Sequence, residues 1–285
     1  MDQGLNKILK DNDRQLRLND DGYTIFPFLD DKEIGNLTEY FFSVQKELPE
    51  RFYSSTHASD PEFRKNTSEF IKSVVSSKVE NKFSNYRLLG GAFVVKPPKG
   101  KGLLPPHQDW NIVNEELGRS YNIWVPLCNV TVENGAVFVL PGSHNKFPTY
   151  RGPGIDSIYK NIENIVWESL TPLPMRSGEA LLYDHALLHA SPVNQTETIR
   201  LGIVCGIIPA DKQMQLHFKT GEGISTYQVT EDFFLQHDPM KGPVGLQLIS
   251  SIDRSILPLS SEQYRTLFLK DKSSNLKSWL QKLFR

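Results

Sequence analysis

The hydrophobic pattern changes character near residue 86 of this chain. Before that point, apolar residues recur at the three- and four-residue spacing of amphipathic helices. Five of them, from Ile34 to Leu48, share one helical face in "LDDKEIGNLTEYFFSVQKEL". Asp30 and Glu33 are spaced as in a capping box at the start of that helix. A second helix is predicted in "DPEFRKNTSEFIKSVVSSKVENKF", with Pro61 in its first turn, and a short strand in "GYTIFPFL".

After residue 86, short runs rich in Val, Ile, Phe, Tyr and Trp are bounded by Gly, Pro and Asn, which is typical of strands. The runs are "RLLGGAFVVK", "SYNIWVPLCNVTV", "GAVFVLPGS", "GEALLYDHALLHAS" and "RLGIVCGIIPA". Few helical patterns separate them, so an antiparallel sandwich or barrel is favoured over a parallel α/β sheet. The long interruption at 145–177 is interpreted as a lid, with a short helix near "YKNIENIVWESL".

We therefore expect one domain with three parts. Residues 1–85 form a mostly helical support, 86–210 the β core, and 211–285 a C-terminal extension with helices. The last segment, "NLKSWLQKLFR", is amphipathic and is expected to pack against the body or a neighbouring subunit. The oligomeric state stays open between monomer and homodimer.

Composition narrows the range of partners. The formal net charge is −1, which provides no long-range field for nucleic acid or for an anionic membrane, so a small-molecule or protein partner is favoured, and we expect a small-molecule substrate. No apolar run approaches the length of a membrane span or a secretory signal, and we expect a cytoplasmic protein. The two cysteines, Cys128 and Cys205, lie in apolar runs and are interpreted as buried thiols.

A possible metal site begins in "LPPHQDWN". On a strand, residues i and i+2 point to the same side, so His107 and Asp109 can reach one interior point. A third ligand has to come from elsewhere in the chain. The candidates are His185 and His189 in "YDHALLHAS", which an unbroken strand would place on the same face.

The spacing to Arg200 favours His189 as the third ligand, with His185 as the alternative. Arg200 follows His189 by 11 residues and begins the next predicted strand. If the two strands were adjacent and antiparallel, joined by the turn "SPVNQTET", both side chains would enter one cavity. Two imidazoles and one carboxylate on one side of a metal are typical of non-haem Fe(II) oxygenases, because three coordination positions stay open. Arg200 would then hold the distal carboxylate of a 2-oxo acid.

These residues carry a resemblance to a known family. The chain resembles the phytanoyl-CoA dioxygenase family of Fe(II)/2-oxoglutarate-dependent oxygenases over about residues 18 to 210. The most specific matches are "HQD", "ENGAVFVLPGSH" and the interval from His189 to Arg200. The resemblance implies a double-stranded β-helix, the jelly-roll barrel of cupin-like proteins, flanked by helices. It also implies Fe(II), 2-oxoglutarate and O₂ as cofactor and cosubstrates.

By resemblance, His107, Asp109 and His189 bind iron and Arg200 binds 2-oxoglutarate. Trp124 and Ser191 match positions beside the cosubstrate, and Asn122 shares a strand face with Trp124. Because Asp109 is present, hydroxylation is favoured over halogenation, whose family members carry a small residue there. Possible substrate contacts are residues next to the site or in the expected lid: Trp110, Asn111, Tyr150, Arg151 and Tyr183.

The function predicted from the sequence is hydroxylation of a C–H bond in a small molecule, with release of succinate and CO₂. Two alternatives remain at this stage. A cupin-like enzyme without redox chemistry could use the same ligands with another metal. A catalytically silent binding protein would be expected to have lost a ligand, whereas this chain keeps all three.

Overall fold

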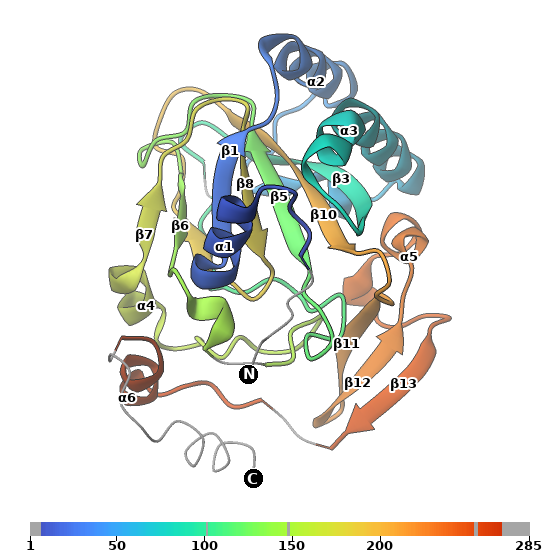
Figure 1. Cartoon of the computed structure of the whole chain (residues 1–285), viewed down its shortest axis with the longest axis vertical. Helices are drawn as coiled ribbons and strands as arrows, with labels where there is room; N and C mark the ends of the chain where they lie inside the picture. Colours follow the sequence, from blue (N-terminus) through green and yellow to red (C-terminus); the bar gives the residue numbers. More distant parts are fainter. Residues whose placement is uncertain (1–6, 101, 147–148, 254–255, 270–285) are drawn as a thin grey trace.

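Two antiparallel sheets form the body of the computed structural model, which describes residues 7–100, 102–146, 149–253 and 256–269 (Figure 1). The larger sheet has the spatial order β1 (Tyr23–Pro27), β8 (Glu179–Asp184), β5 (Tyr121–Pro126), β10 (Arg200–Pro209), β3 (Tyr86–Lys96) and β2 (Tyr53–Ser54). The smaller has the order β4 (Leu104–His107), β9 (His189–Ser191), β6 (Val137–Val139) and β7 (Thr171–Leu173). This arrangement is consistent with the predicted jelly roll. Among the described residues the strand pairings form separate sheets and do not close into one barrel.

The two predicted N-terminal helices are confirmed. In α2 (Asp31–Val44), the Asp30 carboxylate accepts from the Glu33 N–H at 2.9 Å. The Glu33 carboxylate accepts in return from the Asp30 N–H, completing the capping box. In α3 (Pro61–Lys82), Pro61 occupies the first turn, where its missing N–H leaves no hydrogen bond unmade. α2 ends at Val44, so Leu48 lies outside the helix and is exposed.

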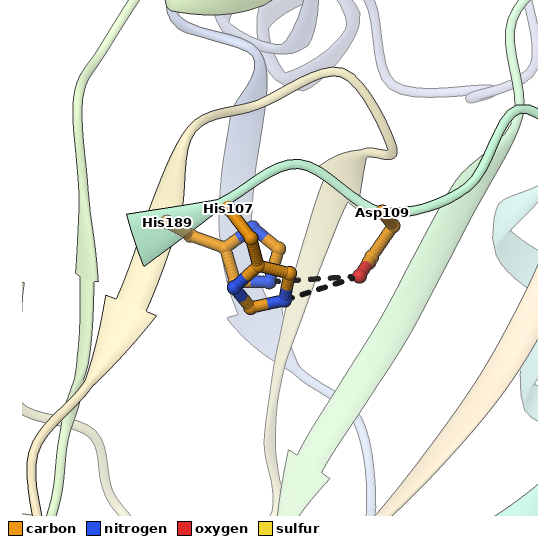
Figure 2. A group of neighbouring side chains, drawn as sticks. All are labelled: His107, Asp109 and His189. Atoms are coloured by element: carbon orange, nitrogen blue, oxygen red, sulfur yellow. Dashed lines mark ion pairs between the residues drawn. The ribbon is translucent and has the colours of Figure 1, made fainter. Parts of the chain in front are cut away.

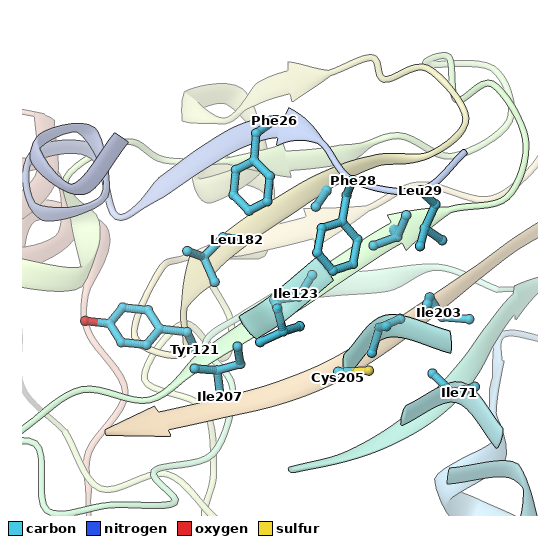
Figure 3. Close-up of a cluster of buried hydrophobic side chains, with 14 of the residues drawn as sticks. Phe26, Phe28, Leu29, Ile71, Tyr121, Ile123, Leu182, Ile203, Cys205 and Ile207 are labelled. Carbon is cyan, nitrogen blue, oxygen red and sulfur yellow. The ribbon is translucent and has the colours of Figure 1, made fainter. Parts of the chain in front are cut away.

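The alternation of side chains along the larger sheet separates a hydrophobic core from a cavity. On one face, Ile123 of β5 and Ile203 of β10 pack with Ile71 of α3, as Figure 3 shows. Each of these side chains is at most 2% exposed, and burying one stabilises the fold by about 1.5–3 kcal/mol. Asn122 and Trp124 flank Ile123 and line a cavity on the opposite face. The helices therefore cover one face of the sheet and leave the other for a site.

The remaining α-helices are short, with ten residues or fewer. They are α1 (Asn12–Asp21), α4 (Glu163–Ser169), α5 (Glu231–Gln236) and α6 (Ser261–Tyr264). The expected helix near "YKNIENIVWESL" is confirmed as α4. No helix in the described ranges is long and apolar enough to cross a bilayer. Both cysteines are free; Cys205 is buried, as expected, whereas Cys128 is partly exposed.

The C-terminal extension contains the expected helices, α5 and α6, and in addition a sheet that was not predicted. This third sheet is antiparallel, with the order β11 (Gln215–Thr220), β12 (Gly223–Gln228) and β13 (Gln247–Ile252). Leu216 and Phe218 are the signal that was missed, because they alternate with polar residues and pack with Val113 in one core cluster. The amphipathic segment "NLKSWLQKLFR" lies outside the described residues.

Candidate metal centre and its cavity

Strand pairing brings together two histidines that are far apart in the sequence. His107 at the end of β4 lies directly opposite His189 at the start of β9, and their ring centroids are 4.2 Å apart. Asp109 follows in the loop after β4, where its N–H donates to the His185 carbonyl at 2.8 Å. Figure 2 shows both imidazoles turned toward the Asp109 carboxylate, with Nε2–Oδ1 distances of 3.5 Å for His107 and 3.8 Å for His189.

Hydrogen bonds orient all three side chains so that each could offer an atom to a metal ion. Nδ1 of His107 lies 2.7 Å from the Pro105 carbonyl, and Nδ1 of His189 lies 2.9 Å from the Leu187 carbonyl. A carbonyl only accepts, so each Nδ1 carries a proton and each Nε2 keeps a lone pair for a metal. Asn122 donates to Oδ2 of Asp109 at 2.8 Å and leaves Oδ1 available. One donor atom from each residue lies within 4.8 Å of the others.

The electrostatics of the group suit a cation. Burial lowers the pKa of His189 to about 4, so this imidazole is neutral near pH 7. Burial raises the pKa of Asp109, but His189 and His107 outweigh it and hold that pKa well below its usual range. Burial alone would lower the pKa of His107. The hydrogen bond and charge of Asp109 outweigh burial, so the pKa of His107 is raised above its ordinary value. A neutral imidazole and an ionised carboxylate are the forms that bind a metal.

His185 and His189 do not lie on one unbroken strand, so the condition under which they would share a face is not met. β8 ends at Asp184, and the chain turns before β9 begins at His189. The turn separates the two rings, and His189 joins the candidate metal group while His185 does not. Nδ1 of His185 instead contacts Ser120 Oγ at 3.0 Å and the Trp110 carbonyl at 3.2 Å.

The expected adjacency of the strands that carry His189 and Arg200 is wrong. β9 belongs to the smaller sheet and β10 to the larger one, so residues 192–199 cross between sheets instead of forming a hairpin. Both side chains nevertheless line the same cavity. They reach it from opposite sheets because each strand turns one face inward.

Arg200 is a buried cation with spare hydrogen-bonding capacity. Its side chain lies over the Trp124 ring, 5.2 Å from the ring centroid, and the residue is 2% exposed. Nη1 donates to the Gly135 carbonyl at 2.5 Å and contacts Ser191 Oγ at 3.4 Å. Among the described residues Nε has no hydrogen-bond partner, and no carboxylate pairs with the guanidinium. Burial lowers the pKa of Arg200 to about 10, so the charge remains at neutral pH.

The loop of the "ENGAVFVLPGSH" motif supports this arginine. Gly135 adopts a φ of +93°, which favours glycine, and a Cβ there would lie 2.9 Å from the Pro192 carbonyl oxygen. The Gly135 carbonyl accepts from Arg200 and also from Ser191 Oγ, at 2.9 Å. A buried cation without a carboxylate partner is costly, so the arrangement favours an anionic ligand at Arg200.

A cavity of about 450 Å³ joins these residues. It is lined by the metal group and Arg200, and by Asn122, Trp124, Ser191, Trp110 and Tyr183 among the other residues considered from the sequence. Phe52, Val94, Leu104, Ile112, Val137 and Val204 supply much of the rest of its wall, which is mostly apolar. A cavity of this size and character is typical of a small-molecule site.

Three of the candidate substrate contacts do not line the cavity. Arg151 is 7% exposed, forms an ion pair with Glu115 and donates from Nε to the Asp109 carbonyl at 2.6 Å. Asn111 accepts from the Arg151 N–H at 2.6 Å, and Tyr150 packs edge-on against His217. These contacts support the loop that carries Asp109.

The described part of the predicted lid, 145–177, does not line the cavity either. Its α4 packs with Tyr159 and Tyr264 in a separate core cluster, and its β7 extends the smaller sheet. Residues near His57 and the C-terminal residues Phe234 and Pro239 lie along the cavity instead. Sequence reasoning missed them because they lie outside the strand-rich region.

The fold and the site together indicate a class: jelly-roll proteins in which two histidines and one carboxylate could hold a metal ion beside a buried arginine. Residues 20–202 match the model of the phytanoyl-CoA dioxygenase (PhyH) family, and the chain belongs to that family. It is 29% identical over 156 residues to mouse phytanoyl-CoA dioxygenase domain-containing protein 1, covering 50% of this chain and 52% of the relative. A probable phytanoyl-CoA dioxygenase of Caenorhabditis elegans is 26% identical over 148 residues, covering 47% and 46%. The chain thus spans about half the length of the curated relatives that it matches.

Solved structures show the same fold at low identity. The alpha-ketoglutarate-dependent carbocyclase SnoK from nogalamycin biosynthesis has a TM-score of 0.52 and 18% identity, covering 72% of this chain and 86% of that protein. The epimerase SnoN from the same biosynthesis has a TM-score of 0.52 and 19% identity, covering 88% and 96%.

Proposed function

We propose that this protein is an iron- and 2-oxoglutarate-dependent oxygenase that hydroxylates a C–H bond of a small molecule. The observation that carries the proposal is the presence, in one cavity, of three oriented metal ligands and a buried arginine without a carboxylate partner among the described residues. The reaction would consume the substrate, 2-oxoglutarate and O₂, and yield the hydroxylated product, succinate and CO₂. Bound iron would supply the redox chemistry that activates O₂.

The chain's own residues would bind, orient and shield the reactants. His107, Asp109 and His189 would hold the metal from one side. Arg200 would hold the distal carboxylate of 2-oxoglutarate with two parallel hydrogen bonds, and its contact with the Trp124 ring would help to hold the guanidinium in place. The apolar wall would exclude water, which strengthens these charge interactions.

Asp109 supports hydroxylation as the outcome. Its carboxylate belongs to the metal group and is held by Asn122, so no position is left for a halide ligand in its place. The size of the cavity supports a small-molecule substrate.

The test is formation of succinate from 2-oxoglutarate with Fe(II) and O₂, before any substrate is known. Wild type should form succinate slowly, and His189→Ala should lose both this turnover and tight Fe(II) binding under anaerobic conditions. His217→Ala is the matched control, because this buried imidazole contacts Thr226 at 2.8 Å and does not line the cavity. Succinate formation that persists in His189→Ala would refute the proposal. A metal-dependent activity that needs no 2-oxoglutarate would favour the non-redox alternative.

A further inference from the structure

A second, smaller cavity of about 160 Å³ adjoins the main one. We call it the annex. Five residues line both cavities, namely Thr56, Ile112, Asn122, His185 and Phe234. These residues form the boundary between the two cavities.

His185, on the boundary between the two cavities, has an unused hydrogen-bond acceptor. The residue is 5% exposed, and Nε2 is buried with no hydrogen-bond partner among the described residues. Its Nδ1 lies 3.0 Å from Ser120 Oγ, which can accept or donate, and 3.2 Å from the Trp110 carbonyl, which can only accept. A proton on Nδ1 satisfies both contacts and leaves Nε2 with a free lone pair. A buried acceptor without a partner is costly, and a ligand that donates to it would remove that cost.

Few charged side chains in the described walls of the two cavities are free to pair with a ligand. In the main cavity the one Lys or Arg side chain is Arg200, which 2-oxoglutarate would occupy. In the annex, Arg64 donates to the carbonyls of Leu235, at 2.9 Å, and of Ala58. The Glu231 carboxylate there pairs with Lys72 at 2.9 Å. A substrate with phosphate or carboxylate groups would find no unengaged cation in these walls.

We propose that the substrate is an uncharged, mainly apolar molecule with a hydroxyl group that donates a hydrogen bond to Nε2 of His185. This assignment rests on the proposed function for its place in the reaction. The apolar part would lie against the wall of the main cavity, and the hydroxyl would fix which carbon faces the metal group. The phosphates of a coenzyme A thioester would find no unengaged cation in the described walls of this site, so such a thioester should bind more weakly than the alcohol.

The experiment measures binding, so it does not depend on turnover. The probes are primary alcohols of increasing size, from cyclohexylmethanol to farnesol, each with its methyl ether and its carboxylic acid, and lauroyl-CoA. Calorimetry is run without O₂, with and without Fe(II), and with 2-oxoglutarate present to occupy Arg200. Wild type should bind the best-fitting alcohol about fivefold more tightly than its ether, the value of one typical net hydrogen bond.

Two variants distinguish a hydrogen bond between His185 Nε2 and the substrate from the contact that holds the His185 ring in place. His185→Phe keeps a ring but removes the acceptor, so the preference for alcohol over ether should fall to about one. Ser120→Ala removes the contact to Nδ1 and leaves Nε2 intact, so the fivefold preference should remain. If His185→Phe does not fold, ¹⁵N resonances of wild-type histidine give the same answer, since only the alcohol should shift the Nε2 signal of His185.

Three results would overturn the inference: tighter binding of an acid or of lauroyl-CoA than of the alcohols, an unchanged preference in His185→Phe, or no binding of any alcohol in the series. Failure of the proposed function is recognised separately. In that case succinate formation is absent while the preference for alcohols, and its loss in His185→Phe, remain.

Discussion

Replacing Arg200 with methionine separates the energetic cost of a buried cation from its value for binding. Burial lowers the pKa of this guanidinium from an ordinary value of 12.5 to about 10. At 1.36 kcal/mol per pKa unit, keeping the charge buried at pH 7 costs about 3 kcal/mol. Arg200→Met would remove that cost.

The same substitution also removes favourable contacts. The charged hydrogen bond to the Gly135 carbonyl contributes about 1.5–3 kcal/mol, and the contact with the Trp124 ring about 1–2 kcal/mol. Ser191 Oγ still donates to the Gly135 carbonyl, so no acceptor is left unpaired there. Gain and loss nearly cancel, and the unfolding free energy of the ligand-free protein should change by no more than about 1–2 kcal/mol.

Affinity for 2-oxoglutarate should respond very differently. Two charge-assisted hydrogen bonds to its distal carboxylate contribute at least about 3 kcal/mol together, so their loss weakens binding by at least about 100-fold. Urea unfolding and anaerobic titration of the Fe(II)-loaded protein measure the two quantities. A loss of more than about 4 kcal/mol in stability, or a change below about threefold in affinity, would refute the reasoning.

The matched control is Lys96→Met. Lys96 is a buried basic side chain directly opposite Arg200 on β3, but it does not line the cavity. Burial, together with the charge of Arg200, lowers the pKa of Lys96 to about 7. Its Nζ donates to the carbonyls of Gly102, Ser191 and Pro192. Affinity for 2-oxoglutarate should therefore stay within about threefold of wild type, which tests whether loss of any buried basic side chain in this region has the effect.

Two further substitutions test the support of the site. Asn122→Ala removes the hydrogen bond to Oδ2 of Asp109 and should weaken Fe(II) binding about 10- to 100-fold in anaerobic titration; equal affinity would show that the carboxylate is oriented without it. Burial raises the pKa of Asp184 to about 6, more than Arg119 lowers it. Because ionisation is unfavourable in the fold, this residue should reduce the unfolding free energy by about 3 kcal/mol as pH rises from about 4 to above 6. Asp184→Asn keeps the acceptor for the Ala186 N–H and should remove that decrease in urea unfolding at pH 4 and 7, whereas an identical pH dependence in both proteins would contradict the assignment.

Local signals in the sequence determined the elements on which the site is built. The capping box at Asp30 and Glu33 fixed the start of α2, since both hydrogen bonds join residues three apart. Runs rich in β-branched and aromatic residues, bounded by Gly, Pro and Asn, predicted the strands β3, β5, β8 and β10, which are buried along most of their length. The donor types at His107, Asp109 and His189 indicated a metal site because few other arrangements use that set.

Only the tertiary structure decided how those elements meet. The pairing of His107 with His189 joins strands some 80 residues apart, and no local pattern encodes such a contact. The turn that separates His185 from His189 and the crossing of the chain between sheets before Arg200 follow from that pairing. Arg151 illustrates the physical reason. Its position in the sequence suggested a substrate contact, but its guanidinium forms an ion pair with Glu115, 36 residues away. Residue type and local pattern set which groups are available, whereas long-range packing sets which of them remain free to bind a ligand.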